Sequence, residues 1–209
     1  MKPTEILSLE HRVIEWMLAC LEKITADAGA RGRLDLQMAK EALDFFRNYA
    51  DRLHHGKEEE LLFPVLENLG FPKNAGPTAV MRMEHVTGRN FVKAMARAAK
   101  SAGDGDSQAV DIFCSQARGF IAMMREHIVK EDECLFTMAD NTLDDHAQSS
   151  LLESFGRFEE DEIEAGLHQR MVDLAMSVAK RLGIEIEDGS DGRVEYTRDE
   201  CAAASGEED

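Results

Sequence analysis

Two segments of the chain repeat one pattern of histidine, lysine, acid and a Leu-Phe pair. Residues 54–64 read HHGKEEELLFP, and residues 127–136 read HIVKEDECLF. In both segments a glutamate follows the first histidine by four residues, which places the two side chains on one face of a helix. The pattern therefore predicts two helices that each present an imidazole beside a carboxylate.

The repetition extends to an earlier helix in each half of the chain. Residues 7–11 read LSLEH and residues 81–85 read MRMEH, in each case an aliphatic pair followed by Glu-His. This lone histidine precedes the histidine of the longer segment by 43 residues in the first half and by 42 in the second. Similarity at a fixed spacing indicates a duplicated structural unit. We interpret the chain as two tandem copies of one helical hairpin.

Apolar residues at helical spacing, separated by Gly- and Pro-rich breaks, predict the helix boundaries. The first helix is expected from Pro3 to a break at residues 29–32, and the second over residues 34–69. The third is expected over residues 77–101 and the fourth over residues 108–140. Four long helices joined by short turns predict an all-α protein with an up-down-up-down four-helix bundle.

A further helical region is expected over residues 148–182, interrupted near Gly156 and Gly166. Beyond residue 183, acids outnumber bases and Gly and Ser accumulate, which is typical of a mobile segment. The predicted division of the chain is a bundle over residues 1–142, a helical extension packed on it over residues 143–183, and an acidic, mobile tail over residues 184–209.

The chain of 209 residues is strongly acidic, with 41 Asp and Glu against 24 Lys and Arg. A net charge of −17 opposes binding to nucleic acid or to an anionic membrane surface. No apolar run is long enough to cross a bilayer and no signal-peptide pattern is present, so the expected location is the cytoplasm. The cysteines show no paired spacing, which fits a reducing compartment. The oligomeric state is left open.

Buried ionisable residues are the strongest functional signal in the sequence. In the α-helical period, His54 and Glu58 fall on the apolar stripe of the second helix, and His127 and Glu131 occupy the matching places in the fourth. A buried carboxylate is costly unless it is paired or bound to a metal ion. Repetition of the same set in both hairpins makes chance a poor explanation. The predicted metal ligands are His11, His54, Glu58, His85, His127 and Glu131.

Other histidine and acid pairs are open to a structural interpretation. His11/Glu15 and His55/Glu59 are interpreted as exposed i,i+4 pairs, although His55 and Glu59 are also candidates for an additional ligand or a ligand-supporting role. In the C-terminal helical region, acids and a histidine recur at four-residue spacing, and they could supply a seventh ligand or cover an open coordination position. An exposed helix face is the preferred interpretation. These residues are Glu160, Glu164 and His168.

The donor set limits the identity of the metal. Imidazole and carboxylate without thiolate suit iron, manganese or zinc rather than copper(I) or an iron–sulfur cluster. Two carboxylates from opposing helices can each bridge a pair of cations, and two imidazoles for each metal would complete a near-symmetric dinuclear centre. Iron is preferred. The ferritin-like proteins use Glu-x-x-His instead, so that class is set aside.

Residues 4–140 resemble the hemerythrin-like, HHE cation-binding family, most specifically through the pattern HxxKEExxLFP at residues 54–64. The resemblance implies the six ligands named above and a non-haem centre of two iron ions with an oxo or hydroxo bridge, for which zinc or manganese could substitute. It also implies that Glu58 and Glu131 bridge the metals. Oxygen-carrying members have a fifth histidine where this chain has Arg89, so the set is closer to members that repair iron centres.

Three functions remain open from the sequence. The leading one is a non-haem di-iron protein that binds or senses oxygen, nitric oxide or peroxide, or handles iron. The second is a di-iron enzyme with peroxidase- or oxidase-like activity, or a factor for iron-centre repair. The third is a mononuclear or zinc-filled structural site. No separate acid–base or nucleophile constellation appears, so the metals would supply all of the chemistry.

Overall fold

The computed structural model describes residues 1–162 and 166–186, with the backbone alone at residues 161 and 162. Every regular element in these residues is a helix, which confirms the all-α prediction. The predicted mobile tail lies outside the described residues from 187 onward, and Glu164 is also outside them. None of the described helices combines the length and the apolar character needed to cross a bilayer.

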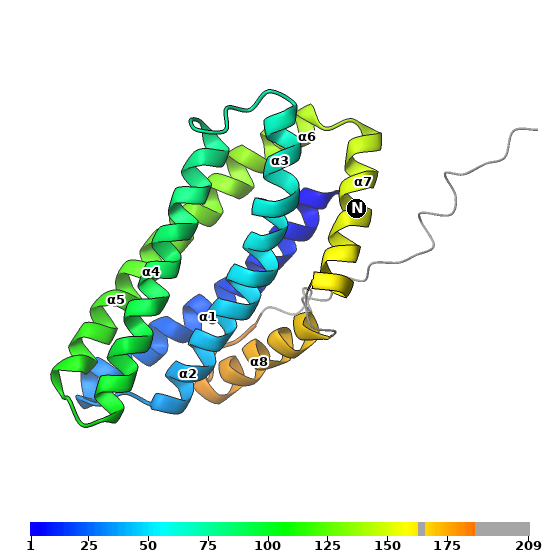
Figure 1. The fold of residues 1–209 in the computed structure, drawn as a ribbon. Helices are drawn as coiled ribbons and strands as arrows, with labels where there is room; N and C mark the ends of the chain where they lie inside the picture. The colour runs from blue at the N-terminus through cyan, green and yellow to red at the C-terminus, as the bar shows by residue number, and fades with distance from the viewer. Residues whose placement is uncertain (163–165, 187–209) are drawn as a thin grey trace, which may run out of the picture.

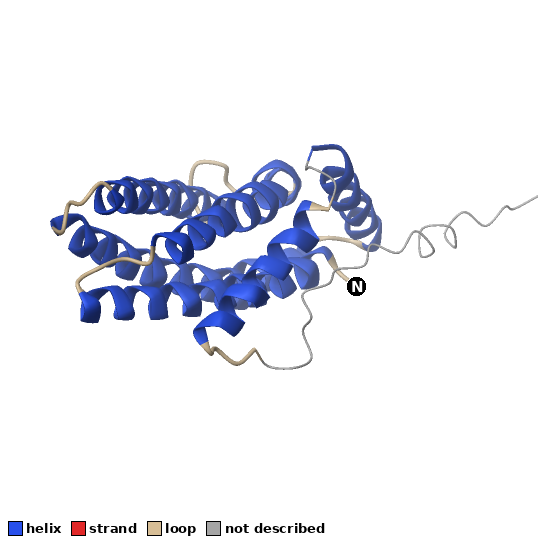
Figure 2. Ribbon diagram, turned by 90° about the horizontal axis from the view of Figure 1, so that it is seen from below, coloured by secondary structure: helices blue, strands red, loops and turns tan. Residues whose placement is uncertain are grey.

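Four long helical stretches lie side by side, and a C-terminal pair of helices packs along them (Figures 1 and 2). α4 packs against α5, α1 packs against α5, and α2 contacts both α1 and α4. α8 lies against α1 and α2, and α7 contacts α1 and η2. Within the described residues the elements are α1 (Pro3–Arg31), α2 (Leu36–Phe45), η1 (Phe46–His55), η2 (Glu58–Leu62), α3 (Phe63–Asn68), α4 (Pro77–Gly103), α5 (Gln108–Lys130), η3 (Glu131–Leu135), α6 (Phe136–Thr142), α7 (Asp145–Arg157), η4 (Phe158–Glu162) and α8 (Leu167–Leu182).

The helix ends follow the local chemistry of the sequence, with one exception. The side chain of Asp35 accepts a hydrogen bond from a backbone N–H of the first turn of α2, and Asp144 does the same for α7. Gly166 has φ of 74°, a left-handed conformation that separates η4 from α8. Near Gly156, where an interruption was predicted, the helix does not break: α7 ends at Arg157 and passes directly into the π-helical η4 at Phe158.

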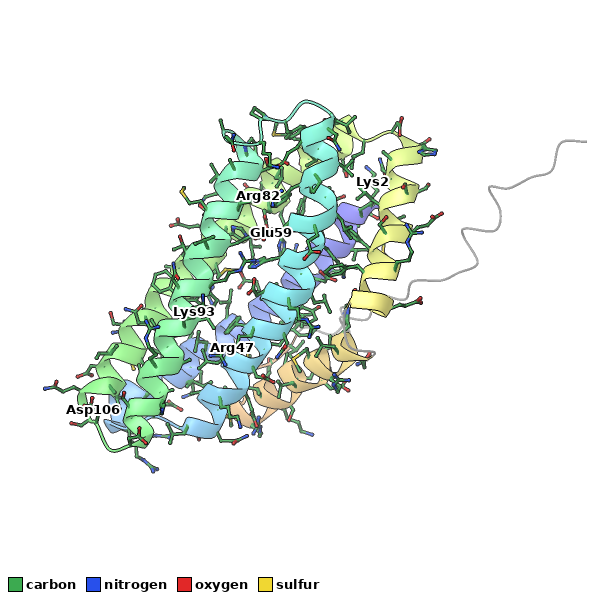
Figure 3. The ribbon with its side chains drawn as sticks, in the orientation of Figure 1. Lys2, Arg47, Glu59, Arg82, Lys93 and Asp106 are labelled. Carbon is green, nitrogen blue, oxygen red and sulfur yellow. The ribbon has the colours of Figure 1, made fainter. Side chains whose placement is uncertain are left out.

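Several helical stretches contain π-helical segments, which the sequence prediction did not anticipate. η1 and η2 follow α2, and η3 follows α5. Arg47 on η1 and Glu59 on η2 are labelled in Figure 3. The i→i+5 hydrogen bonds of a π-helix widen the turn, so side-chain directions drift away from the α-helical period. All three segments coincide with, or adjoin, the repeated His-x-x-x-Glu patterns.

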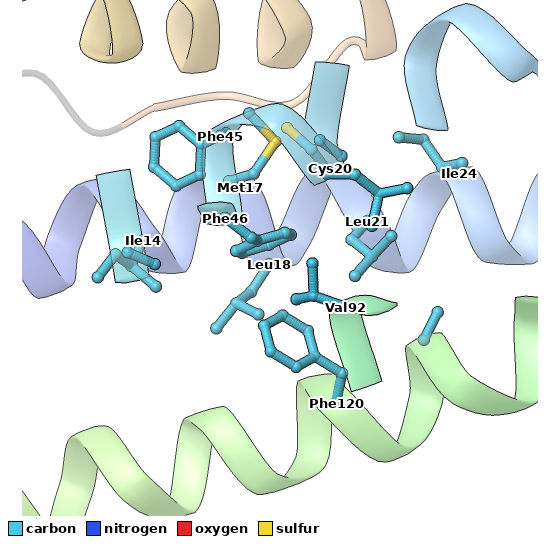
Figure 4. Packing of buried hydrophobic residues seen from close by; sticks show 14 of the residues in the cluster. Ile14, Met17, Leu18, Cys20, Leu21, Ile24, Phe45, Phe46, Val92 and Phe120 are labelled. Atoms are coloured by element: carbon cyan, nitrogen blue, oxygen red, sulfur yellow. The ribbon is translucent and has the colours of Figure 1, made fainter. Parts of the chain in front are cut away.

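The apolar core is divided by a polar layer. A large cluster, part of which is shown in Figure 4, fills the space between α1, α2, α4, α5 and α8. A smaller cluster lies among η2, α3, α6 and α7. Along α1, Ile6 and Leu7 belong to the smaller cluster and Val13 to the larger one, with Glu10 and His11 between them. The second and fourth helical stretches repeat this order, so their polar residues lie at one depth in the molecule.

Candidate metal centre

The structure brings all six predicted ligands together in this polar layer. Each is at most 1% exposed to solvent. The four helical stretches contribute them as the duplicated hairpin predicts, with a lone histidine on the first helix of each hairpin and a His-x-x-x-Glu pair on the second. The residues and their elements are His11 on α1, His54 on η1, Glu58 on η2, His85 on α4, His127 on α5 and Glu131 on η3.

Glu131 lies between histidines of different helices. Its Oε2 is 3.3 Å from Nε2 of His11 and 3.2 Å from Nε2 of His127. Its Oε1 is 3.9 Å from Nε2 of His85. One carboxylate therefore approaches the ring nitrogens of three histidines, which is the placement needed for a bridging ligand.

Glu58 takes the equivalent position in the other half of the centre. Its Oε1 is 3.7 Å from Nε2 of His54, and its Oε2 is 3.4 Å from Nε2 of His85. Nε2 of His85 is also 3.2 Å from Nε2 of His127. In every case Nε2 is the ring nitrogen directed toward the centre.

Unpaired buried atoms provide a test of whether a cation fits these residues. Among the described residues, both carboxylate oxygens of Glu58 and of Glu131 are buried without a hydrogen-bond partner, and so are the Nε2 atoms of His11 and His54. Buried polar groups are normally satisfied, so such a concentration requires an explanation. All of these atoms are metal donors. Two groups have donor atoms within 4.8 Å of one another and share Glu58: His11, His54, Glu58 and Glu131, and His55, Glu58, His85 and His127.

Outer carboxylates fix the histidine rings within each hairpin. Nδ1 of His54 lies 2.9 Å from Oε2 of Glu10, and Nδ1 of His127 lies 3.0 Å from Oε2 of Glu84. Each acid directly precedes the lone histidine of its hairpin in the sequence. Because a carboxylate accepts, Nδ1 carries the proton, which leaves the Nε2 lone pair available to a metal.

A second pair of outer carboxylates links one hairpin to the other. Nδ1 of His85 lies 2.7 Å from Oε1 of Glu59, and Nδ1 of His11 lies 2.9 Å from Oδ1 of Asp132. Both acids follow the predicted ligand glutamate of the opposite hairpin by one residue. With the bonds inside each hairpin, they form a closed ring of four hydrogen bonds that passes through every helical stretch. We call this the outer ring.

The sequence left two interpretations open for two of these residues. His11 faces the centre, as expected of a predicted ligand, so the alternative of an exposed pair with Glu15 is wrong; Glu15 lies 3.5 Å from Arg125 instead. Glu59 binds His85, which fits the expected ligand-supporting role and not the exposed pair. The signal that could have identified the outer ring is the repeat itself, because acids occupy matching positions beside both ligand pairs.

His55 is the main correction to the predicted site. It was expected to face solvent, but it is 4% exposed, and its ring stacks on that of His85 with the centroids 3.8 Å apart. Its Nδ1 is 3.5 Å from Oδ1 of Asp51, and neither ring nitrogen makes a hydrogen bond within the described residues. His55 ends the π-helical segment η1, whose wide turn lets two consecutive histidines face inward. The second hairpin has Ile128 at this position.

Arg89 supports the centre from outside. Its Nε lies 2.7 Å from Asp51, and one of its terminal nitrogens lies 3.0 Å from Oε1 of Glu59, the acid that holds His85. The fifth imidazole of this site therefore comes from His55 on η1, while the corresponding place on α4 holds a guanidinium that positions acids. Arg82 adds a hydrogen bond to the backbone oxygen of Glu59.

The C-terminal extension covers one half of the centre through a buried ion-pair network. Lys57 is fully buried and contacts both Glu10 of the outer ring and Glu159 of η4. His168 of α8 lies 3.3 Å from Glu159 and is largely buried, so the exposed-face interpretation is wrong for this residue. Glu160 is exposed, as expected. Glu10, Glu159 and His168 could themselves hold a cation, but the ammonium group of Lys57 already lies between the two acids.

Burial and mutual charge set the protonation of the centre. Burial lowers the pKa of His54 and of His85 well below the ordinary value, so both are neutral, as metal ligation requires. Burial, with the charge of Glu131, raises the pKa of Glu58. Burial alone would lower the pKa of His127, but the negative charge of Glu131 outweighs burial and raises this pKa to about 9. At neutral pH the metal-free centre therefore retains a proton on His127 that a cation would displace.

Comparisons with known proteins agree with this geometry. Uncharacterized proteins of Mycobacterium bovis and of two strains of Mycobacterium tuberculosis are each 25% identical over 180 residues, which is 86% of this chain and 70% of the relative. No solved structure shows a significant match. The sequence-family model of the hemerythrin HHE cation-binding domain matches residues 2–139, which is well over half of the sequence. The chain belongs to the hemerythrin HHE cation-binding domain family.

Proposed function

We propose that this protein holds a non-haem di-iron centre and uses it to bind or sense a small molecule such as oxygen, nitric oxide or peroxide. The observation that carries the proposal is the convergence of buried, unpaired carboxylate and imidazole atoms on one point between two apolar clusters. Two overlapping donor groups support two cations rather than one. The proposed ligands are His11, His54, His55, His85, His127, Glu58 and Glu131, with the two glutamates bridging.

The proposed architecture is the up-down-up-down bundle of four helical stretches over residues 1–142. Residues 143–183 would form an extension that covers one side of this bundle, and residues 184–209 a tail. The contacts of α8 with α1 and α2 support this division, as does the ion pair between Glu159 and Lys57. The metal would thus be held by the bundle alone, and the extension would act on it through Glu10.

The protein residues would orient and shield the metals. The outer ring fixes each histidine with Nε2 inward, so the imidazoles need no rearrangement when a cation arrives. Phe63 and Phe136 stack near His85 and His11, with ring centroids 6.0 and 5.5 Å apart, and limit access of water. When bound, a pair of iron ions would supply open coordination positions and electrons for oxygen, nitric oxide or peroxide. The asymmetry between His55 and Ile128 would make the two metal positions inequivalent.

Metal content tests the ligand assignment. Glu58→Ala and Glu131→Ala should each lower the metal bound per chain to half of the wild-type value or less, because each removes a donor that serves both positions. Loss of a ligand typically lowers affinity more than the roughly 10–100-fold lost with an outer partner. Glu15→Ala is the matched control, because Glu15 lies on α1 outside the centre, and it should retain wild-type metal content.

The readout is elemental analysis of the purified protein together with its visible spectrum. Equal metal content in all three variants would contradict the assignment. Stopped-flow spectra of the reduced protein mixed with oxygen, nitric oxide or peroxide then identify the small molecule. A stable spectral change without consumption supports binding or sensing, whereas continuous consumption of peroxide supports the enzyme alternative.

A further inference from the structure

A cavity of about 250 Å³ lies beside the candidate metal centre, between η1 and α4. Its walls are mostly apolar and include Phe46, Val92, Phe120 and Met124, all of which are buried. Gly88 of α4 also lines it, and a Cβ at this position would lie 3.3 Å from Cε of Met123 and 3.7 Å from Phe120. The absence of a side chain at Gly88 thus keeps this space open between three helices.

The rim of the cavity is positively charged. Arg47 on η1 and Lys93 on α4 both line it and are exposed, and Figure 3 shows them on the two neighbouring helices. Arg89 and Asp51 also line it, but they pair with each other. Neither Arg47 nor Lys93 forms an ion pair within the described part of the chain. Two positively charged side chains without an acidic partner at the rim of one cavity are unusual in a protein of net charge −17.

One polar group of the wall is buried and unsatisfied. His55 lines the cavity, is 4% exposed, and has no hydrogen bond at either ring nitrogen within the described residues. It also belongs to one of the two donor groups of the metal centre. The cavity therefore extends from a cationic rim, along an apolar wall, to a residue of the centre itself.

We propose that this cavity binds a small organic anion with an apolar body, of the class of short-chain monocarboxylates. Its carboxylate would lie between Arg47 and Lys93, and its hydrocarbon chain would pack against Phe46, Val92 and Phe120. An apolar pocket with a few convergent polar groups is the usual form of a small-molecule site. Occupancy would place the ligand beside His55, so the anion would act next to the metals without being one of their ligands.

The test is a calorimetric titration of the full-length protein with hexanoate, compared with hexanol and hexylammonium. Hexanoate should bind more tightly than either, because only it combines the chain with a negative charge. The double variant Arg47→Gln/Lys93→Gln should weaken hexanoate binding roughly ten-fold or more, since hydrogen bonds to charged groups are lost. The control variant Arg97→Gln/Lys100→Gln removes two exposed cations of α4 outside the cavity and should leave binding unchanged.

A second variant tests the location of the apolar part. Gly88→Val fills the space between α4 and Phe120 and should abolish hexanoate binding, with folding checked by circular dichroism. No binding of hexanoate to the wild-type protein would overturn the proposal. Equal binding of hexanol would overturn the anion class, and hexanoate binding that survives in Arg47→Gln/Lys93→Gln would overturn the site. Metal content measured on the same samples reports separately on the proposed function.

Discussion

The duplicated hairpins provide two lysines at matching positions with opposite environments. Lys57 is fully buried and contacts both Glu10 and Glu159. Lys130 contacts Glu84 in the same way, but its side chain is 44% exposed. Replacing each lysine by methionine keeps an unbranched apolar side chain that is one atom shorter and removes the charge. Comparing the two variants therefore shows how burial changes the contribution of the same Lys–Glu contact to stability.

The expected effects differ several-fold. Removing one partner of a buried ion pair costs roughly 3–5 kcal/mol, because the remaining charge stays buried without compensation. An exposed pair contributes about 0–1 kcal/mol. In a chain of this size 1 kcal/mol corresponds to about 2–4 °C in Tm. Lys57→Met should therefore lower Tm by roughly 6–20 °C, and Lys130→Met by about 4 °C at most.

Thermal and denaturant unfolding of the metal-free proteins measures the difference, and its pH dependence tests the cause. In the wild type, burial alone would raise the pKa of Glu159. His168 and Lys57 outweigh burial and lower this pKa to about 2. Without Lys57, the buried acids of the folded state would titrate above their unfolded values. The lost stability should then grow as pH rises above the ordinary carboxyl pKa and shrink in acid. Equal losses for Lys57→Met and Lys130→Met, or a loss independent of pH, would refute the reasoning.

Two further predictions concern packing and protons. Gly56→Ala should destabilise the protein by about 1–3 kcal/mol, because its Cβ would lie 2.7 Å from Cζ of Phe158, and Phe158→Leu should recover part of the loss in a denaturant titration. Adding Fe²⁺ anaerobically at about neutral pH should release protons from the metal-free protein. The pKa of about 9 at His127 means that this group holds a proton there, and burial also raises the pKa of Glu58. The apparent metal affinity should therefore rise with pH up to that range, and a pH-independent affinity by competition titration would contradict this assignment.

The fold was predictable because its signals are local and repeated. Apolar periodicity and Gly or Pro breaks located the long helices to within a few residues, and the internal repeat indicated which histidines and glutamates meet. The prediction stopped at His55, because an α-helical period was assumed where η1 and η2 have a wider turn. Hydrogen-bond geometry of this kind is not encoded in apolar spacing, so two adjacent histidines could not be placed on the same side from the sequence.

The contribution of the extension was unpredictable for another reason. Glu159, Glu160 and Glu164 are equivalent by composition, and only the packing of η4 on the bundle turns Glu159 toward Lys57 while leaving Glu160 exposed. That packing depends on Phe158, which sits against Gly56. Long-range contacts of this type, about 100 residues apart in the sequence, arise only once the helices have docked.

The outer ring has a consequence for how such a site can be assembled from smaller pieces. A single hairpin carries one complete link, from Glu10 to His54, together with one free donor and one free acceptor, His11 and Glu59. Those two groups find partners only on another hairpin. Two identical half-length peptides related by a twofold axis could therefore form the same outer ring of hydrogen bonds as the tandem chain. In a tandem chain the two halves can differ, and this protein has His55 in one half where the other has Ile128.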